Sequence, residues 1–163
     1  MDTQEALQTA IKGEIEGREL YKAAAEKTED AKAKEVFQML ADEEQGHYDS
    51  LMQMAKEYAQ GQELTMPQLS APASFQDAES PIFTREFKEK VSDFDMTALS
   101  IGIKLELESE KFYREMAEKS EEKEAKELFS KLADWERGHY DYLKSQVGFF
   151  ESYYSTKYSL FRF

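Results

Sequence analysis

The chain contains no cysteine, three prolines and only seven glycines among its 163 residues. The absence of cysteine excludes disulfide bonds, thiolate metal sites and iron-sulfur clusters, so any metal would have to be bound by oxygen and nitrogen ligands. The scarcity of glycine and proline, with abundant Ala, Glu, Lys, Leu and Met, favours long helices over a sheet. A chain of this length has room for one domain with a buried core.

Positive charge and long apolar runs are also scarce. Lysine and arginine number 21 against 34 acidic residues, which gives a formal net charge of -13. Such a charge repels phosphates, so no nucleic-acid partner is expected, whereas it suits cations. No apolar run approaches the roughly 20 residues of a membrane-spanning helix, and the first ten residues do not resemble a signal peptide. We therefore expect no membrane partner and a cytoplasmic location.

An internal repeat organises what is present. At an offset of 92 residues, positions 6–51 align with positions 98–143 without a gap, and 24 of the 46 pairs are identical. Each copy is too long for one helix and contains a polar turn near its middle, Thr28-Glu29-Asp30 in the first copy and Ser120-Glu121-Glu122 in the second. The pattern predicts two duplicated helical hairpins, at about 2–58 and 95–147.

Signals for helix starts and for the link between the hairpins support this division. Asp2, with Glu5 three residues on, has the spacing of a capping box, and Asp95 is placed to cap the third helix. All three prolines lie in the connection at about 61–93, where a short helix is predicted near 84–90. Links between helices usually have about 2 to 8 residues, so a connection of this length predicts a crossover that returns along the whole bundle.

The predicted fold is therefore all-α: a four-helix bundle over residues 1–147, built from two hairpins and a long crossover of the kind that ferritin-like folds require. Residues 148–163 form a tail that is rich in phenylalanine and tyrosine. Exposed aromatic surface of that extent promotes aggregation. We expect the tail to pack on the bundle or on a partner subunit.

Two glutamates occupy apolar helix faces. At about 100° per residue, Glu14 lies in the middle of the apolar stripe of the first helix, and Glu106 repeats this position in the third. Glu16 lies about 200° away from Glu14 and belongs to the solvated face, although it is repeated as Glu108. Glu16 remains the alternative ligand of that helix.

The second helix of each hairpin carries a Glu-x-x-His motif. Glu44 and His47, like Glu136 and His139, are three residues apart, which brings both side chains to one helix face. The chain has only two histidines, and both lie in this motif. Glu14 and Glu44 are equally far from the turn centre at Glu29, so an antiparallel hairpin places them at the same depth. The same holds for Glu106 and Glu136 about Glu121.

Four inward carboxylates require compensation, because burying each one unpaired costs several kcal/mol. Two divalent cations would neutralise all four. The alternative, that each acid is partly exposed or paired with lysine, suits a single motif better than a repeated one. The predicted metal ligands are Glu14, Glu44, His47, Glu106, Glu136 and His139. Such oxygen-rich sites with one imidazole per metal suit Fe(II) or Mn(II), and zinc could also occupy them.

With a Glu and a Glu-x-x-His motif in each of two hairpins, the chain resembles the ferritin-like superfamily, and within it the rubrerythrin and erythrin group. The resemblance implies two iron ions on these six ligands, some glutamates bridging both, and a reaction with hydrogen peroxide or dioxygen in oxidative-stress defence. We also expect a homodimer. Tyr21 and Tyr113 would hydrogen-bond the ligand carboxylates, unless they are simply core aromatics.

The chain departs from the usual rubrerythrins at three places. It lacks their four-cysteine rubredoxin domain, so electrons would come from another protein such as a rubredoxin. It has His139 where they place a glutamate. On the third helix it offers Ser109 or Glu110 where they have an additional glutamate, which leaves Glu110 as a seventh ligand or a surface acid. The symmetric ligand set is more similar to bacterioferritin. Between its own halves, Glu43 is matched by Trp135, which we attribute to packing or an interface.

Three functions remain in competition. The first is a di-iron peroxidase or oxidase. The second is iron oxidation followed by storage in a shell of subunits, as in ferritins. The third is a structural bundle, with or without zinc, that has no catalytic activity.

Overall fold

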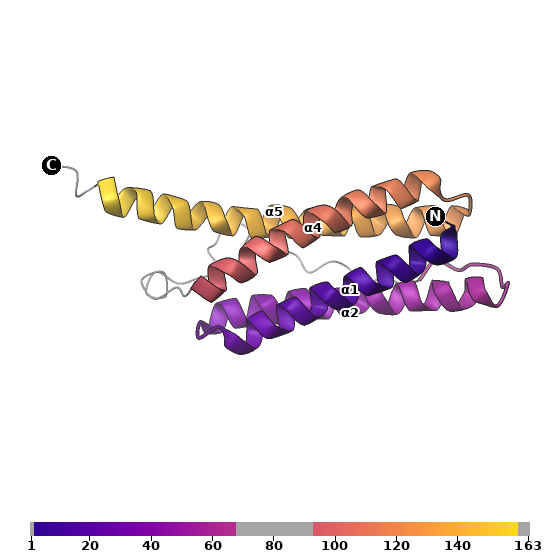
Figure 1. The fold of residues 1–163 in the computed structure, drawn as a ribbon, viewed down its shortest axis with the longest axis horizontal. Coiled ribbons are helices and arrows are strands. Elements are labelled where there is room, and N and C mark those ends of the chain that lie inside the picture. The colour runs from indigo at the N-terminus through magenta and orange to yellow at the C-terminus, as the bar shows by residue number, and fades with distance from the viewer. Residues whose placement is uncertain (1, 68–92, 160–163) are drawn as a thin grey trace.

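The computed structural model describes residues 2–67 and 93–159 (Figure 1). This part of the chain consists of four long helices and the short segments that flank them: α1 (Thr3–Lys27), α2 (Ala31–Ala59), α4 (Asp93–Lys119) and α5 (Lys123–Ser159). No strand occurs in these two ranges. The predicted all-α four-helix bundle is confirmed.

The helix ends follow the polar turns that the repeat indicated. The Asp2 carboxylate accepts a hydrogen bond from the Glu5 amide at 2.8 Å, and the Glu5 carboxylate accepts one from the Asp2 amide at 3.3 Å, which completes the predicted capping box. Asp30 caps α2 by accepting from the Ala33 amide at 2.8 Å. The prediction that Asp95 caps the third helix is wrong, because α4 begins two residues earlier and includes it.

The two hairpins lie side by side, α1 with α2 and α4 with α5 (Figure 1). The Thr3 hydroxyl donates to the Glu122 carboxylate at 3.1 Å, which joins the start of α1 to the turn between α4 and α5. Helix α2 ends at this end of the bundle and α4 begins at the other (Figure 1). The end of α2 and the start of α4 therefore lie at opposite ends of the bundle. Residues 68–92, with the short helix predicted near 84–90, lie outside the described residues.

Two apolar clusters fill the bundle, one toward each hairpin turn. One cluster includes Tyr21, Phe37, Leu40 and Leu99, and the other includes their repeat counterparts Tyr113, Phe129, Leu132 and Leu7. The sequence duplication thus appears as an approximate two-fold relation in space. Between the two clusters lies a layer of buried acidic and histidine side chains.

Helix α5 extends beyond the predicted end of the second hairpin. It continues past Val147 to Ser159, so the described part of the aromatic tail is helical, and it runs beyond the ends of the other three helices (Figure 1). Residues 160–163 lie outside the described residues. None of the described helices is long and apolar enough to cross a membrane.

Candidate metal centre

Each helix contributes one or two side chains to the polar layer. Each of these side chains belongs to a residue that is at most 3% exposed. They are Glu14 from α1, Glu44 and His47 from α2, Glu106 from α4, and Glu136 and His139 from α5. The structure therefore brings together all six residues that the sequence marked as candidate ligands.

The six residues form two overlapping groups. In each group, one ligand atom per residue can be chosen so that all chosen atoms lie within 4.8 Å of one another. The first group is Glu14, Glu44, His47 and Glu136, and the second is Glu44, Glu106, Glu136 and His139. Glu44 and Glu136 belong to both groups, so each hairpin contributes a carboxylate to the group centred on the other.

The three carboxylate oxygens around His47 Nδ1 are better satisfied by a metal ion than by a single N–H group. Its Nδ1 atom lies 3.2 Å from Glu14 Oε2, 3.2 Å from Glu136 Oε1 and 3.6 Å from Glu44 Oε2. One N–H group can be directed well at only one of these oxygens, and Glu136 Oε1 makes no hydrogen bond within the described residues. A metal ion could be bound by the nitrogen and the three carboxylates together.

The second group repeats this arrangement around His139. Its Nδ1 atom lies 3.3 Å from Glu106 Oε2, 3.4 Å from Glu44 Oε1 and 3.9 Å from Glu136 Oε2. Both imidazoles therefore present Nδ1 to the carboxylates. The donor set of carboxylate oxygens and one imidazole nitrogen per group suits Fe(II), Mn(II) or Zn(II).

Without a metal, the layer must hold protons. Burial, with the nearby Glu44, raises the pKa of Glu14 to about 8. Burial also raises the pKa of Glu136, with repulsion from Glu44 and Glu106 adding to it. Burial opposes ionisation of Glu44 as well, but hydrogen bonds from Glu14 and the two histidines outweigh it and hold the Glu44 pKa well below its usual range.

The histidines gain protons for a different reason, namely the negative charge of the carboxylates around them. Burial alone would lower their pKa values, but the carboxylates around them, Glu14 for His47 and Glu106 for His139, raise both well above the ordinary value. Protonated acids and imidazolium ions are what a buried layer of carboxylates needs when no other cation is present. A bound metal would displace these protons, so metal binding and proton release would be linked.

Two tyrosines connect the hairpins at the ligands. The Tyr21 hydroxyl on α1 donates to Glu106 on α4, and the Tyr113 hydroxyl on α4 donates to Glu14 on α1. Gly102 makes room for Tyr21, because a Cβ atom there would lie 3.2 Å from the tyrosine oxygen. Each tyrosine thus orients a carboxylate that belongs to only one of the two groups.

The other imidazole nitrogen meets different neighbours in the two halves. His139 Nε2 lies 2.5 Å from Glu43 Oε2, in a hydrogen bond to the α2 helix of the other hairpin. His47 has the Trp135 ring beside it, with ring centroids 4.8 Å apart, and its Nε2 atom has no hydrogen-bond partner among the described residues. The divergence of Glu43 from Trp135, which we attributed to packing or an interface, therefore lies against the two histidines.

The alternative acids lie outside both groups. Glu16 and Glu108 have more than half of their side chains exposed and pair with Lys12 and Lys104 of the same helices. Glu110, the candidate seventh ligand, lies 3.6 Å from Arg114 and 3.6 Å from Arg137. The arginines account for its charge, and it belongs to neither ligand group.

A cleft between α1 and α4 leads to the centre. Its volume is about 230 Å³, and the carboxylates of Glu44, Glu106 and Glu136 contribute to its lining. Gly17, also in the lining, lets Glu44 approach α1, because a Cβ atom there would lie 3.4 Å from the Glu44 carboxyl carbon. A molecule of a few atoms could reach the ligands by this path. Ser109 lies in the same lining.

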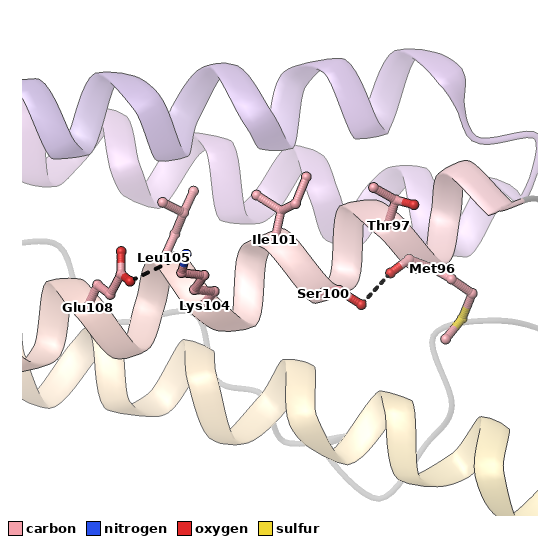
Figure 2. A pocket seen from close by; sticks show the side chains of 7 residues that line it. All are labelled: Met96, Thr97, Ser100, Ile101, Lys104, Leu105 and Glu108. Atoms are coloured by element: carbon pink, nitrogen blue, oxygen red, sulfur yellow. Dashed lines mark hydrogen bonds and ion pairs between the residues drawn. The ribbon is translucent and has the colours of Figure 1, made fainter.

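A larger hollow of about 660 Å³ follows α4 from Met96 to Glu108 (Figure 2). It contains none of the six candidate ligands. Its polar groups are occupied within the helix, since the Ser100 hydroxyl donates to the Met96 carbonyl at 2.8 Å and Lys104 lies 3.8 Å from Glu108 (Figure 2). The candidate metal-binding groups found among the described residues therefore lie in the buried layer and not in this hollow.

Comparison with known proteins agrees with the four-helix fold. A sequence profile described as rubrerythrin matches residues 5–147. A solved structure of a hypothetical protein from Pyrococcus furiosus superposes with a TM-score of 0.69 at 28% identity, covering 94% of this chain and 92% of that chain. No protein with a curated description matches the chain.

Proposed function

The chain belongs to the rubrerythrin family, and we propose that it is a cytoplasmic di-iron enzyme that reduces hydrogen peroxide, or reacts with dioxygen, in defence against oxidative stress. The observation that carries the proposal is that Glu44 and Glu136 belong to both ligand groups, which is the arrangement needed to hold two ions side by side. Two ferrous ions bound there would supply two electrons as they become ferric, so that one hydrogen peroxide and two protons yield two waters.

The residues of the chain have separate tasks in this proposal. Glu44 and Glu136 would bind both ions, while Glu14 with His47 and Glu106 with His139 would each bind one. The hydroxyls of Tyr21 and Tyr113 hold Glu106 and Glu14 in place. The cleft between α1 and α4 would admit a small oxidant, and the apolar clusters on either side keep bulk water from the layer.

The proposed reaction consumes electrons, which the metal ions would have to regain after each turnover. The sequence has no cysteine, so no rubredoxin-type or other thiolate centre is available within it. We propose an external donor protein such as a rubredoxin, and a homodimer as the working form. The size of the protein by light scattering, and reduction of its ferric form by added reduced rubredoxin, test these two points.

Stopped-flow oxidation tests the activity itself. The protein loaded anaerobically with two Fe(II) is mixed with hydrogen peroxide, and ferric absorbance is followed. We expect oxidation much faster than that of free ferrous ion, and a return to the free-ion rate in the Glu44→Ala, Glu136→Ala double variant. Oxidation no faster than that of free ferrous ion would contradict the proposal.

Iron storage is separated from this activity by size and capacity. A storage protein would form a shell of many subunits and take up far more than two irons per chain, whereas the proposed enzyme stops at two. Light scattering and iron uptake under air distinguish them. A small oligomer that saturates at two irons per chain supports the enzyme.

A further inference from the structure

The two imidazoles of the layer have different neighbours at Nε2, the ring nitrogen that faces away from the four candidate-ligand carboxylates. His139 donates through Nε2 to the Glu43 carboxylate at 2.5 Å, while the same atom of His47 faces no acceptor among the described residues. The two positions correspond in the repeat, since Glu43 and Trp135 are 92 residues apart. The ligand groups are therefore nearly symmetric, but their support is not.

A carboxylate behind an imidazole affects the nitrogen at the other side of the ring. A metal bound at Nδ1 requires the proton to be on Nε2, and a carboxylate that accepts this proton fixes both the tautomer and the ring orientation. It also makes Nδ1 more electron-rich and so a better ligand. Glu43 satisfies this description for His139, because its side chain is only 11% exposed and its oxygen contacts Nε2.

The indole ring beside His47 provides none of these effects. Trp135 lies 4.8 Å from the His47 ring, centroid to centroid, at an interplanar angle of 43°. It packs against the imidazole, but it has no oxygen that could accept the Nε2 proton. The His47 ring is therefore held by packing, whereas the His139 ring is held by packing and by charge.

We propose that Glu43 is a positioning residue for His139 and makes the metal position beside His139 the tighter of the two. This inference rests on the proposed function in one respect, namely that the six residues hold two ions. It goes further by ranking the two positions. The ion beside His139 enters first and leaves last, and the ion beside His47 is the more readily exchanged.

The two histidines provide a direct reading of each position. Because the chain has no other histidine, the imidazole nitrogens give two sets of signals in a nitrogen-15 NMR spectrum, which one His→Ala variant assigns. Metal-free protein is titrated with Zn(II), a diamagnetic probe for both positions. We expect the His139 signals to change to their bound form during the first equivalent and the His47 signals during the second.

The variant Glu43→Gln keeps the size of the side chain and removes its charge. We expect the affinity at His139 to fall by about 10- to 100-fold, the usual effect of losing such a partner, with the affinity at His47 unchanged. The order of filling then becomes simultaneous or reversed. Glu35→Gln, an exposed residue on the same helix, is the matched control and leaves the order unchanged. Circular dichroism establishes that each variant is folded.

A second variant places a carboxylate behind the other histidine. In Trp135→Glu, a carboxylate stands in the position equivalent to Glu43, and we expect binding at His47 to become tighter, which a purely structural role of Glu43 does not predict. Equal filling of both positions in the wild-type protein, or equal weakening of both in Glu43→Gln, would overturn the inference while leaving the two-ion centre in place. No Zn(II) at either histidine would overturn the two-ion centre as well.

Discussion

The two halves of the buried layer have the same candidate ligands and different surroundings. Glu14 and His47 repeat as Glu106 and His139, and each group is completed by the shared Glu44 and Glu136. Behind the ligands the halves differ, since one histidine has a carboxylate at its outer nitrogen and the other has an indole ring. After the duplication, the residues of the two candidate groups have therefore stayed alike, while the residues beside the outer histidine nitrogens have diverged.

The largest effect on metal binding is expected from the two glutamates that belong to both groups. The double variant Glu44→Ala, Glu136→Ala removes the carboxylates common to both groups, so both ions should be lost. Elemental analysis of the purified protein measures this. The matched control is Glu16→Ala, Glu108→Ala, a pair at the same repeat offset with exposed side chains, which should keep two ions per chain. A double variant at Glu44 and Glu136 that still binds two ions would refute the shared-ligand arrangement.

Removing one histidine should separate the halves. His47→Ala and His139→Ala are each expected to retain one ion, because each leaves one complete group. The ion that remains in His47→Ala should be bound more tightly, since it keeps the support of Glu43. Calorimetric titration of each metal-free variant with Zn(II) compares the affinities. Equal affinities would show that the carboxylate behind His139 does not distinguish the positions.

The tyrosines should give a smaller and symmetric pair of effects. Tyr113→Phe removes the donor to Glu14 and Tyr21→Phe the donor to Glu106. In the metal-bound form each is a hydrogen bond to a charged carboxylate, worth about 1.5–3 kcal/mol. We expect each variant to weaken binding at its own position by about tenfold or more and to leave the other position unchanged. Tyr48→Phe, whose ring lies under Arg18 outside the layer, serves as the control. Titration with Zn(II) followed at the histidine signals separates the two positions.

A change of pH should have the smallest effect on the difference between the two halves, because it acts on groups in both halves at once. The folded-state pKa of Glu14 is raised to about 8, and those of both histidines are also raised, so their contribution to stability is present at low pH and is lost as pH rises. Glu44 has the opposite shift, and its contribution is lost only on acidification. Between about pH 6 and about pH 9 the metal-free protein should therefore become easier to unfold in urea.

The metal-loaded protein provides the control for this pH dependence. When metal takes the place of the protons, the loss of stability at the higher pH should disappear, because the carboxylates remain neutralised. Urea midpoints of both forms at the two pH values measure the difference. Equal pH dependence with and without metal would indicate that the ions do not bind at these groups.

Much of the fold could be read from the repeat and from helical periodicity. The offset of 92 residues and the polar turns located the hairpins, and the inward positions of Glu14 and Glu106 followed from the apolar stripes around them. These features are local, because residues one or two turns apart on a helix share a face whatever the helix packs against. The turns at 28–30 and 120–122 also agree with the helix ends in the structure.

Other features depend on how the hairpins meet, which periodicity does not describe. That Glu44 and Glu136 are the shared acids, and that each tyrosine reaches across to the opposite hairpin, follow from the approach of α1 to α4 and of α2 to α5. The contact of Glu43 with His139 was missed for the same reason. Its one signal in the sequence was the break in the repeat at Trp135, directly before the repeated Glu-x-x-His motif.

The most direct test of a two-ion centre is anomalous diffraction from crystals of the protein loaded with iron. The result we predict is two iron peaks in the buried layer, one beside Nδ1 of His47 and one beside Nδ1 of His139, with carboxylate oxygens of Glu44 and Glu136 bound to both. A single peak, or no peak between the two apolar clusters, would contradict this arrangement and leave the four buried glutamates without the cations that explain them.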